Sequence, residues 1–349
     1  MPRIVFLILA VLACSAPVLA QGPISVGEGG TLLRDGQPYR AYGVNFYSAF
    51  MRYLRDPANM SFREGFKELG ELRIPFARFA ACGYMPSDMK LYLENKDEYF
   101  ARMDAVVKCA ENNGVGLVPS LFWYNACVPD LAGEPRNQWG NPDSKTVALM
   151  RRYTRDVVSR YLNSPAIWIW EFGNEFDLAV DLPNAADQRP HINVERGTLA
   201  SRSEADDLRF DMMNVAFREF AKTVREIDPH RPITTGNSLP RPASYNQRKD
   251  LTWVADTRDR FVEQLIAFNP DPNNLLSIHI YTPDHEKRFD QRWTSYDEII
   301  ALSMDASKKA GKPLFIGEWG ARDDKEGADR DAARRDNFEL ITAIDRHRV

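Results

Sequence analysis

The alternation of short apolar segments with amphipathic segments constrains the fold of this chain more than any other feature. The apolar segments are rich in β-branched and aromatic residues, whereas the intervening segments have apolar residues spaced three and four apart and charged residues on the outer positions. Strands are predicted at residues 40–45, 74–80, 116–122, 166–173, 232–236, 275–281 and 313–318. Helices are predicted at residues 61–69, 98–112, 144–162, 206–227, 295–310 and 331–346. Repeated βα units predict a parallel sheet, either closed as a barrel or doubly wound.

The choice between these two folds depends on length and on the loops that follow the strands. No Gly-x-Gly-x-x-Gly sequence follows any predicted strand, which disfavours a dinucleotide-binding sheet. A chain of 349 residues with 44% hydrophobic content suits one (β/α)8 barrel of the TIM type. Only seven strands can be counted, so we expect residues 21–349 to form a C-terminally incomplete barrel that lacks the eighth βα unit.

Two segments outside the βα repeat have recognisable patterns. Residues 32–39 predict a small hairpin around the Asp35-Gly36 pair. Residues 177–203 are polar, charged and rich in turn-forming residues, and they follow directly on the fourth strand. They are predicted to form a long loop on one side of a cleft, because barrel sites are built from such loops.

The N-terminus has the pattern of an export signal. Arg3 supplies a positive charge, residues 4–12 an apolar stretch, and residues 18–20 a small-residue cleavage site. The sequence therefore predicts a signal peptide at residues 1–20 and a secreted or periplasmic protein. A lipoprotein anchored at Cys14 is the lesser alternative. The apolar stretch is too short for a permanent membrane anchor, and no other segment suits a membrane span.

Charge and cysteine content exclude several classes of partner. A net charge of −4 gives no reason to expect nucleic acid or an anionic membrane surface. Cys82, Cys109 and Cys127 follow the signal, so at most one disulfide is expected, with its pairing open. Five His residues and the absence of a Cys-x-x-Cys pair make a metal site unexpected. We expect a monomer without cofactor or metal.

Two of the predicted strands end in glutamate. The run Ile-Trp-Ile-Trp-Glu-Phe-Gly-Asn leads to Glu175, and Pro-Leu-Phe-Ile-Gly leads to Glu318. The carboxyl ends of barrel strands are where barrel enzymes place their catalytic residues. A pair of carboxyl groups placed there matches the acid and the nucleophile that a retaining glycosidase needs.

The glutamates belong to an ordered set of polar residues at strand ends. Arg78 lies on the second predicted strand, Asn174-Glu175 after the fourth, His279-Ile280-Tyr281 at the end of the sixth, and Glu318 at the end of the seventh. With this set the chain resembles glycoside hydrolase family five and its clan of (β/α)8 retaining glycosidases, particularly the secreted β-mannanases and cellulase-like members. The resemblance covers the chain from residue 40 to the end.

The resemblance implies a role for each of these residues. Glu175 would be the acid/base and Glu318 the nucleophile, while Asn174 would contact the sugar 2-hydroxyl. Arg78 and Tyr281 would hold the nucleophile ionised and oriented. His279 would line the same subsite, or would simply be a hydrogen-bonded barrel residue. Five further residues could either contact the sugar, by stacking or hydrogen bonding, or pack in the core, and the two roles are equally expected: Asn45, Tyr47, Trp123, Tyr124 and Trp319. His191, in the polar loop, is expected to be solvated.

Elementary electrostatics supports the two catalytic roles independently. The acid must carry a proton near neutral pH, and the apolar residues Trp168, Trp170 and Phe172 before Glu175 predict surroundings that raise its pKa. The nucleophile must stay charged, and a guanidinium partner favours the charged form. Retention requires the two carboxyl groups to lie ~5 Å apart.

The sequence leaves open which arginine pairs with the nucleophile, and whether the two glutamates have structural roles instead of catalytic ones. Arg78 is expected beside Glu318, with Arg73 as the alternative if the strand register differs. Structurally, Glu175 could begin a helix and Glu318 could form a buried ion pair with Arg78.

The chain departs from the family pattern at two places. It has no eighth strand to carry the aromatic residue that floors the central subsite. Its third strand ends in Ser-Leu-Phe-Trp123, where many relatives have histidine. We therefore expect hydrolysis of a β-1,4-linked polysaccharide, either mannan (a mannan endo-1,4-β-mannosidase) or glucan (a cellulase). A non-catalytic carbohydrate-binding barrel and a metal-dependent barrel hydrolase are the alternatives.

Overall fold

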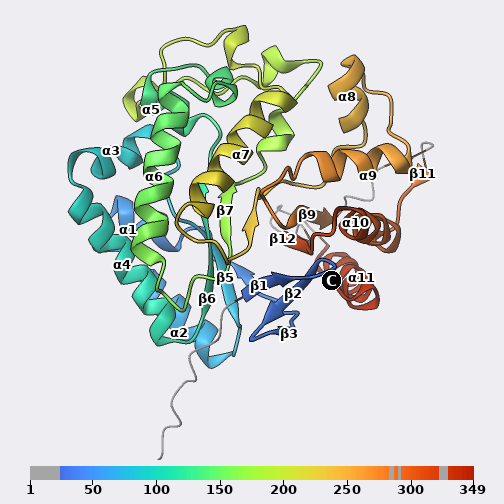
Figure 1. Ribbon diagram of the computed structural model, residues 1–349, viewed down its shortest axis with the longest axis horizontal. Helices are drawn as coiled ribbons and strands as arrows, with labels where there is room; N and C mark the ends of the chain where they lie inside the picture. The colour runs from blue at the N-terminus through green and yellow to red at the C-terminus, as the bar shows by residue number, and fades with distance from the viewer. Residues whose placement is uncertain (1–23, 283–286, 290–291, 322–328) are drawn as a thin grey trace, which may run out of the picture.

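Seven parallel strands carry the fold in this computed structural model, which describes residues 24–282, 287–289, 292–321 and 329–349 (Figure 1). They are β4 (Val44–Asn45), β5 (Phe76–Ala80), β6 (Gly116–Phe122), β7 (Trp170–Gly173), β8 (Ile233–Thr234), β9 (Leu276–Thr282) and β12 (Leu314–Ala321). All seven sequence-predicted strands are present, but several are shorter than predicted. The predicted signal segment and Cys14 lie outside the described residues.

Helices follow the strands as the amphipathic pattern predicts. The six predicted helices correspond to α2 (Ser61–Glu71), α4 (Lys96–Asn112), α6 (Lys145–Tyr161), α7 (Phe210–Arg225), α10 (Tyr296–Ala310) and α11 (Arg330–His347). Five helices were not predicted: α1 (Ala49–Arg55), α3 (Pro86–Glu94), α5 (Cys127–Ala132), α8 (Ser244–Asp250) and α9 (Arg258–Ala267). Most of these are short, and short helices carry too few turns to show a clear apolar period.

The parallel strands form two sheets. The first has the order β4-β5-β6-β7-β8, and the second consists of β12 and β9. Register places Asn45 beside Arg78, and Glu318 beside His279, so polar residues from neighbouring strands meet at the carboxyl ends. The backbone N–H of Leu275 donates to the carbonyl of Ile233 at 3.2 Å, which ties the start of β9 to β8.

The barrel has an open seam between its first and last strands. Among the described residues, β4 pairs only with β5 and β12 only with β9, so no strand lies between β4 and β12. A cavity of about 720 Å³ occupies the seam, lined by residues of both strands, of the N-terminal hairpin and of α11, and it reaches Arg78 and Tyr281. The described residues contain the seven parallel strands that were predicted, and the incompleteness of the barrel at its C-terminus stays a prediction.

The predicted hairpin covers the amino-terminal end of the barrel. Strands β1 (Ile24–Gly27), β2 (Thr31–Arg34) and β3 (Gln37–Pro38) form an antiparallel sheet, and the turn between β2 and β3 is the Asp35-Gly36 pair. Both turn residues have positive φ, 52° and 74°, which is the backbone of a two-residue hairpin turn. The side chain of Ile24 packs with Val118 and Trp168 in the small cluster beneath the strands.

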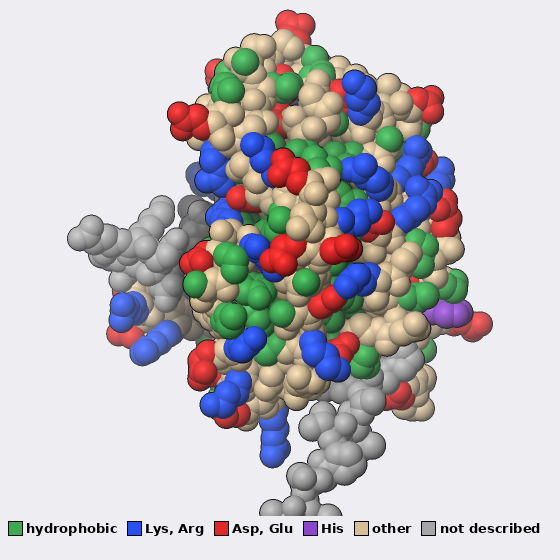
Figure 2. All heavy atoms as spheres, turned by 90° about the vertical axis from the view of Figure 1, so that its left-hand side faces the viewer, with side chains coloured by type: hydrophobic (Ala, Val, Ile, Leu, Met, Phe, Trp, Pro, Cys, Tyr) green, Lys and Arg blue, Asp and Glu red, His purple; other side chains and the backbone are tan. Residues whose placement is uncertain are grey.

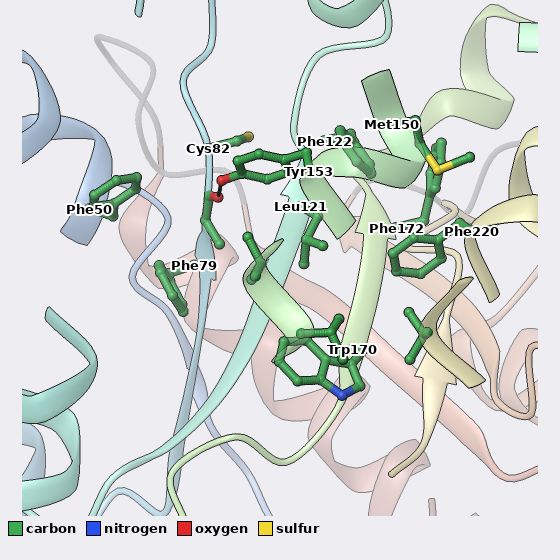
Figure 3. Packing of buried hydrophobic residues seen from close by; sticks show 14 of the residues in the cluster. Phe50, Phe79, Cys82, Leu121, Phe122, Met150, Tyr153, Trp170, Phe172 and Phe220 are labelled. Atoms are coloured by element: carbon green, nitrogen blue, oxygen red, sulfur yellow. Dashed lines mark hydrogen bonds between the residues drawn. The ribbon is translucent and has the colours of Figure 1, made fainter. Parts of the chain in front are cut away.

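The main core lies between the first sheet and its helices. Phe122 of β6, Phe172 of β7 and Phe220 of α7 pack in one cluster with Met150 of α6, and Trp170 joins this cluster at the start of β7 (Figure 3). Ring centroids of Phe172 lie 5.3 Å from Phe122 and 5.4 Å from Phe220. Burying rings of this size supplies most of the free energy that holds a helix layer on a sheet.

Ion pairs join neighbouring outer helices. Arg160 of α6 contacts Asp104 of α4 at 2.5 Å, and Lys96 of α4 contacts Asp156 of α6 at 2.6 Å. On the face shown in Figure 2, basic and acidic side chains are interspersed. Neither sign of charge dominates this face.

The remaining sequence predictions about the scaffold concern the loop, the thiols and the membrane. Residues 177–203 form a largely irregular segment with short 3₁₀ turns, as predicted. Cys82, Cys109 and Cys127 are all free thiols, so none of the possible disulfide pairings forms. In the part of the chain that the structure describes, no helix combines the length and apolar character needed to cross a membrane.

Candidate active site

The two strand-terminal glutamates converge at the carboxyl ends of the strands. Glu175 follows β7, Glu318 lies on β12, and His279 lies on β9 between them. One carboxylate oxygen of each glutamate and Nδ1 of His279 all lie within 4.8 Å of one another. Residues that are 143 positions apart in the sequence therefore form one constellation. Carboxylate oxygens this close leave less room between the two groups than an inverting glycosidase needs for its water.

Glu318 is held by two donors. Nη1 of Arg78 donates to Oε1 at 2.6 Å, and the hydroxyl of Tyr281 donates to Oε2 at 2.5 Å. Burial and the nearby Glu318 carboxylate raise the pKa of Tyr281, so its hydroxyl remains a donor across the physiological range. The alternative partner Arg73 is exposed, so the expected partner Arg78 is confirmed in this position.

Arg78 is the centre of the polar network. Its side chain is 1% exposed, and it donates from Nε to Glu171, from Nη1 to Glu318 and from Nη2 to Oδ1 of Asn174. The ring of Trp123 lies 4.8 Å from its guanidinium carbon, a cation–π distance. A buried guanidinium with this many acceptors has a fixed orientation, because turning it would leave several charged hydrogen bonds unmade.

Glu175 occupies a strained position at the end of β7. Its φ is 54°, in the left-handed region, and its N–H donates to the carbonyl of Gly236 at 2.9 Å. Gly236 must be glycine there, because a Cβ would lie 1.9 Å from the carbonyl oxygen of Gly173. The carboxylate receives a hydrogen bond from Nδ1 of His279 at 3.0 Å.

The expected rise in the pKa of Glu175 is wrong. Burial raises this pKa, but hydrogen bonds from His279 and Ser238 and the charge of Arg78 outweigh it, so the net shift is downward. The apolar residues that motivated the expectation lie elsewhere. Trp170 and Phe172 belong to the main core, because side chains alternate along a strand and only the intervening Glu171 faces the barrel interior. Trp168 packs beneath the strands.

The remaining predicted site residues have mixed positions. Asn174 lies against Arg78, and Asn45 donates to the carbonyl of Gly317 at 3.3 Å, next to Glu318. Trp123 covers Arg78 from one side. Trp319 packs edge-on against Tyr42, with ring centroids 5.9 Å apart, and lines the seam cavity together with Arg78 and Tyr281.

Two of the aromatic residues considered as sugar contacts, Tyr47 and Tyr124, have clearly different positions. Tyr47 is 50% exposed and stacks on Trp123, with ring centroids 6.0 Å apart, so it extends the aromatic surface beside Arg78. Tyr124 instead stacks on Tyr84 at 4.8 Å. His191 is exposed, as expected.

The similarity of this chain to known proteins agrees with the geometry of the two glutamates. Residues 26–347 match the family model described as Cellulase (glycosyl hydrolase family 5). This chain belongs to glycosyl hydrolase family 5. The sequence-based assignment to this family is thereby confirmed.

Among curated proteins, the family 5 chain is similar to fungal enzymes. It is 40% identical to the probable mannan endo-1,4-beta-mannosidase F of Aspergillus oryzae over 229 residues, which cover 63% of this chain and 42% of the relative. It is 24% identical to the mannan endo-1,4-beta-mannosidase F of Aspergillus fumigatus over 332 residues, 86% of this chain and 66% of the relative. The chain spans roughly half the length of the curated relatives it matches.

Solved structures share the fold. The endo-1,4-beta-mannanase of Rhizomucor miehei superposes with a TM-score of 0.63 at 16% identity, covering 94% of this chain and 88% of that one. An endocellulase of Pyrococcus horikoshii superposes with a TM-score of 0.58 at 17% identity, covering 93% and 88%. Together with the family assignment, these likenesses confirm the predicted TIM-type (β/α) barrel architecture.

Two acidic residues of the family 5 site were missed in the sequence. Glu171 is fully buried beside Arg78, and burial raises its pKa above the ordinary value although Arg78 and His279 oppose the rise. Asp177 is buried and accepts from the N–H of Ser238 at 2.9 Å, and desolvation raises its pKa to about 6. A charged residue inside an otherwise apolar strand was the available signal for Glu171. Asp177 had none, because it lies in a loop.

The same constellation has the donors for a metal ion. Glu175, His279 and Glu318 each offer one ligand atom, and these three atoms lie within 4.8 Å of one another. Two carboxylates and one imidazole are a ligand set that divalent transition metals accept. Each of these three side chains also has a hydrogen-bonding role within the site, so a bound ion would compete with that network.

Proposed function

We propose that this chain is a retaining glycoside hydrolase that cleaves β-1,4-linked polysaccharide, with β-1,4-mannan as the first substrate. The observation that carries the proposal is the approach of the Glu175 and Glu318 carboxylates to within 4.8 Å, with a guanidinium and a phenol that both donate to Glu318. Mannan is favoured over glucan because the similar curated proteins are named as mannan endo-1,4-beta-mannosidases.

The proposed reaction assigns different work to the two carboxyl groups. Glu318, oriented by Arg78 and Tyr281, attacks the anomeric carbon, while Glu175 gives its proton to the leaving glycosidic oxygen. Glu175 then takes a proton from the water that hydrolyses the glycosyl-enzyme bond, so the anomeric configuration is retained. Asn174 is placed next to Arg78, where its amide can contact the sugar hydroxyl adjacent to the reacting carbon.

The aromatic residues beside Arg78 support a sugar substrate. Trp123 and the exposed Tyr47 form a stacked pair on one side of the guanidinium. Flat aromatic faces pack against the apolar C–H faces of sugar rings while the hydroxyls remain free to form hydrogen bonds. We propose that both residues, together with Asn45 and Trp319, belong to the substrate-binding surface.

The decisive experiment measures products and variants together. The wild-type protein should release reducing ends from β-1,4-mannan, and NMR of the fresh product should show the β-anomer first. Glu318→Gln should lose at least ~10⁴-fold in turnover while still binding the polysaccharide. Glu175→Gln should lose about 10²–10⁴-fold on mannan but far less on aryl glycosides with good leaving groups, which need no protonation.

The matched control is a glutamate outside the site. Glu263→Gln on the exposed face of α9 should leave all rates unchanged. Equal damage by Glu175→Gln to both substrate types would reject its role as the acid. Release of sugar from β-1,4-glucan alone would keep the mechanism but change the substrate.

The geometry of Glu175, His279 and Glu318 also motivates a metal-dependent hydrolase as a second candidate. Activity that is lost on treatment with a chelator and restored by a divalent ion would favour it over the double-displacement mechanism. Binding of polysaccharide without release of reducing ends would instead indicate a carbohydrate-binding barrel.

We further propose that the protein acts outside the cytoplasm. The proposal rests on the charged, apolar and small-residue pattern of residues 1–20. Expression with this segment, followed by N-terminal sequencing of the exported protein, tests it. A mature N-terminus at Gln21 is the expected result, whereas lipid attached at Cys14 would identify a lipoprotein.

A further inference from the structure

A second buried carboxylate shares the guanidinium that holds Glu318. Oε1 of Glu171 accepts from Nε of Arg78 at 2.7 Å, whereas Oε1 of Glu318 accepts from Nη1 at 2.6 Å. Glu171 is 0% exposed and lies on β7, four residues before Glu175. One positive charge therefore faces two carboxylates, one from each of the two parallel sheets.

The local structure makes room for this carboxyl group. A Cβ on Gly236 would lie 2.9 Å from the carboxyl carbon of Glu171 and even closer to the carbonyl of Gly173. Glycine at this position thus permits both the buried carboxylate and the backbone bond from the N–H of Glu175 to Gly236. The placement of Glu171 is part of the same backbone arrangement that sets Glu175.

A buried carboxylate is costly unless it has a specific partner, and an apolar residue would fill the same space in a buried strand. Glu171 and Glu318 accept from different nitrogens of Arg78, so they share its charge without competing for the same donor. If Arg78 faced Glu318 alone, its full positive charge would stabilise that carboxylate in the resting state. A nucleophile that is more strongly stabilised before reaction than in the transition state reacts more slowly.

We propose that Glu171 is a positioning residue for the nucleophile: it fixes the Arg78 guanidinium through Nε and shares its charge, so that Glu318 is oriented but remains reactive. This inference rests on the proposed glycosidase function. It adds a residue that bonds Arg78 and acts on the nucleophile through this guanidinium.

The charged and titratable groups around Arg78 and Glu318 determine how the pH profile of a variant is interpreted. Those facing Arg78 and Glu318 are Glu171 and Glu175 from β7 and its end, and His279 and Tyr281 from β9. Neutralising Glu171 removes one negative charge from this group without removing an acceptor for Nε. The remaining positive charge of Arg78 then acts more fully on Glu318.

The test is Glu171→Gln, assayed by steady-state kinetics on β-1,4-mannan over a range of pH. We expect kcat to fall ~10-fold or more with KM changed less than ~2-fold, because the substrate does not contact residue 171. The acidic limb of kcat/KM should move to lower pH, since protonation of the nucleophile becomes less favourable beside an unshared guanidinium.

The matched control is Asp228→Asn at the opposite end of the barrel. Asp228 is also buried and also binds a guanidinium, Nη1 of Arg231 at 2.8 Å, and it accepts from the indole of Trp170. This variant should lose stability while keeping the wild-type kcat and pH profile. Comparing the two variants distinguishes the effect of losing a buried ion pair from the effect of losing the influence of Glu171 on the nucleophile through Arg78.

The outcomes distinguish this inference from the proposed function. An inactive wild-type protein would overturn the glycosidase proposal itself. An active wild type with Glu171→Gln at wild-type kcat and with an unmoved acidic limb would overturn the role of Glu171 alone. If Glu171→Gln does not fold, Glu171→Asp keeps the charge but shortens the reach. It should lower kcat with the acidic limb unmoved, and wild-type kcat in this variant would equally overturn the inference.

Discussion

The two sheets of the barrel differ in how they are held together. The sheet β4–β8 has five strands and an aromatic core, in which Phe172 alone has five ring neighbours. The pair β9–β12 has two strands and a smaller core in which Ile and Leu predominate. In Figure 1 the first part, with α4 and α6, lies to the left, and the second, with α10 and α11, lies to the right.

The candidate site is bonded across these two parts. Glu318 from the second part is held by Arg78 from the first, and Glu175 from the first part is held by His279 from the second. Each glutamate therefore depends on a side chain from the other sheet for its orientation. The larger sheet therefore has the larger aromatic core, while the geometry of the site requires both sheets.

The largest expected effect comes from cutting the link from the first part to the second. Arg78→Ala should lower kcat/KM by at least ~10³-fold and the free energy of unfolding by about 3–5 kcal/mol, because two buried carboxylates lose their counter-charge. Enzyme kinetics and urea unfolding measure the two losses. A loss of less than tenfold in kcat/KM would show that Tyr281 alone orients the nucleophile.

The next effect compares the cores by the same substitution in each. Phe172 in the first part and Phe261 in the second are both fully buried, but among the described residues Phe261 has one ring neighbour, Phe289 at 5.7 Å. Replacement by Ala should cost about 3–5 kcal/mol at either site. Phe172→Ala should cost more by roughly 1–2 kcal/mol because more aromatic pairs are lost. Equal losses in urea unfolding would contradict the view that the first core dominates.

A third prediction concerns the pH dependence of stability in the first part. The folded-state pKa of Asp177 is about 6, above its unfolded value of ~3.9, so the folded protein binds the extra proton. The contribution of Asp177 to stability therefore decreases as pH rises from about 4 to about 6. Asp177→Asn keeps an acceptor for the N–H of Ser238 and removes this loss. Relative to wild type, the variant should gain about 2–3 kcal/mol between pH 4 and pH 7 in urea unfolding. An unchanged difference between the two pH values would show that Asp177 does not titrate in this way.

The smallest effect cuts the link from the second part back to the first. The hydrogen bond from His279 is the largest influence that lowers the pKa of Glu175, opposing the rise that burial causes. In the free enzyme the Glu175 proton should therefore leave at a pH below its ordinary range, which predicts an acidic optimum for kcat/KM. In His279→Ala the alkaline limb of kcat/KM should move to higher pH. A limb that stays in place would assign the lowered pKa to Ser238 or Arg78 instead.

Much of this arrangement was predictable from the sequence because it is local in the chain. The period of apolar residues places the seven strands and the longer helices, and the Asp-Gly pair fixes the hairpin turn. Glu175 and Glu318 were predicted as site residues because each ends an apolar strand, and the ends of parallel strands meet at one edge of a sheet. The pairing of Arg78 with Glu318 was expected from the resemblance to glycoside hydrolase family five, with Arg73 as the alternative.

Other features were decided only by the tertiary structure. The sequence predicted apolar surroundings and a raised pKa for Glu175, yet its nearest partners are His279 and Ser238, which are 104 and 63 residues away. Glu171 also had no visible partner in the sequence, because Arg78 lies 93 residues earlier. The sequence by itself determined which residues reach the carboxyl edge of the barrel, since strand period and strand ends are local properties. Only the packing of the two sheets decided which charges face one another, because protonation depends on distances between residues that are remote in the chain.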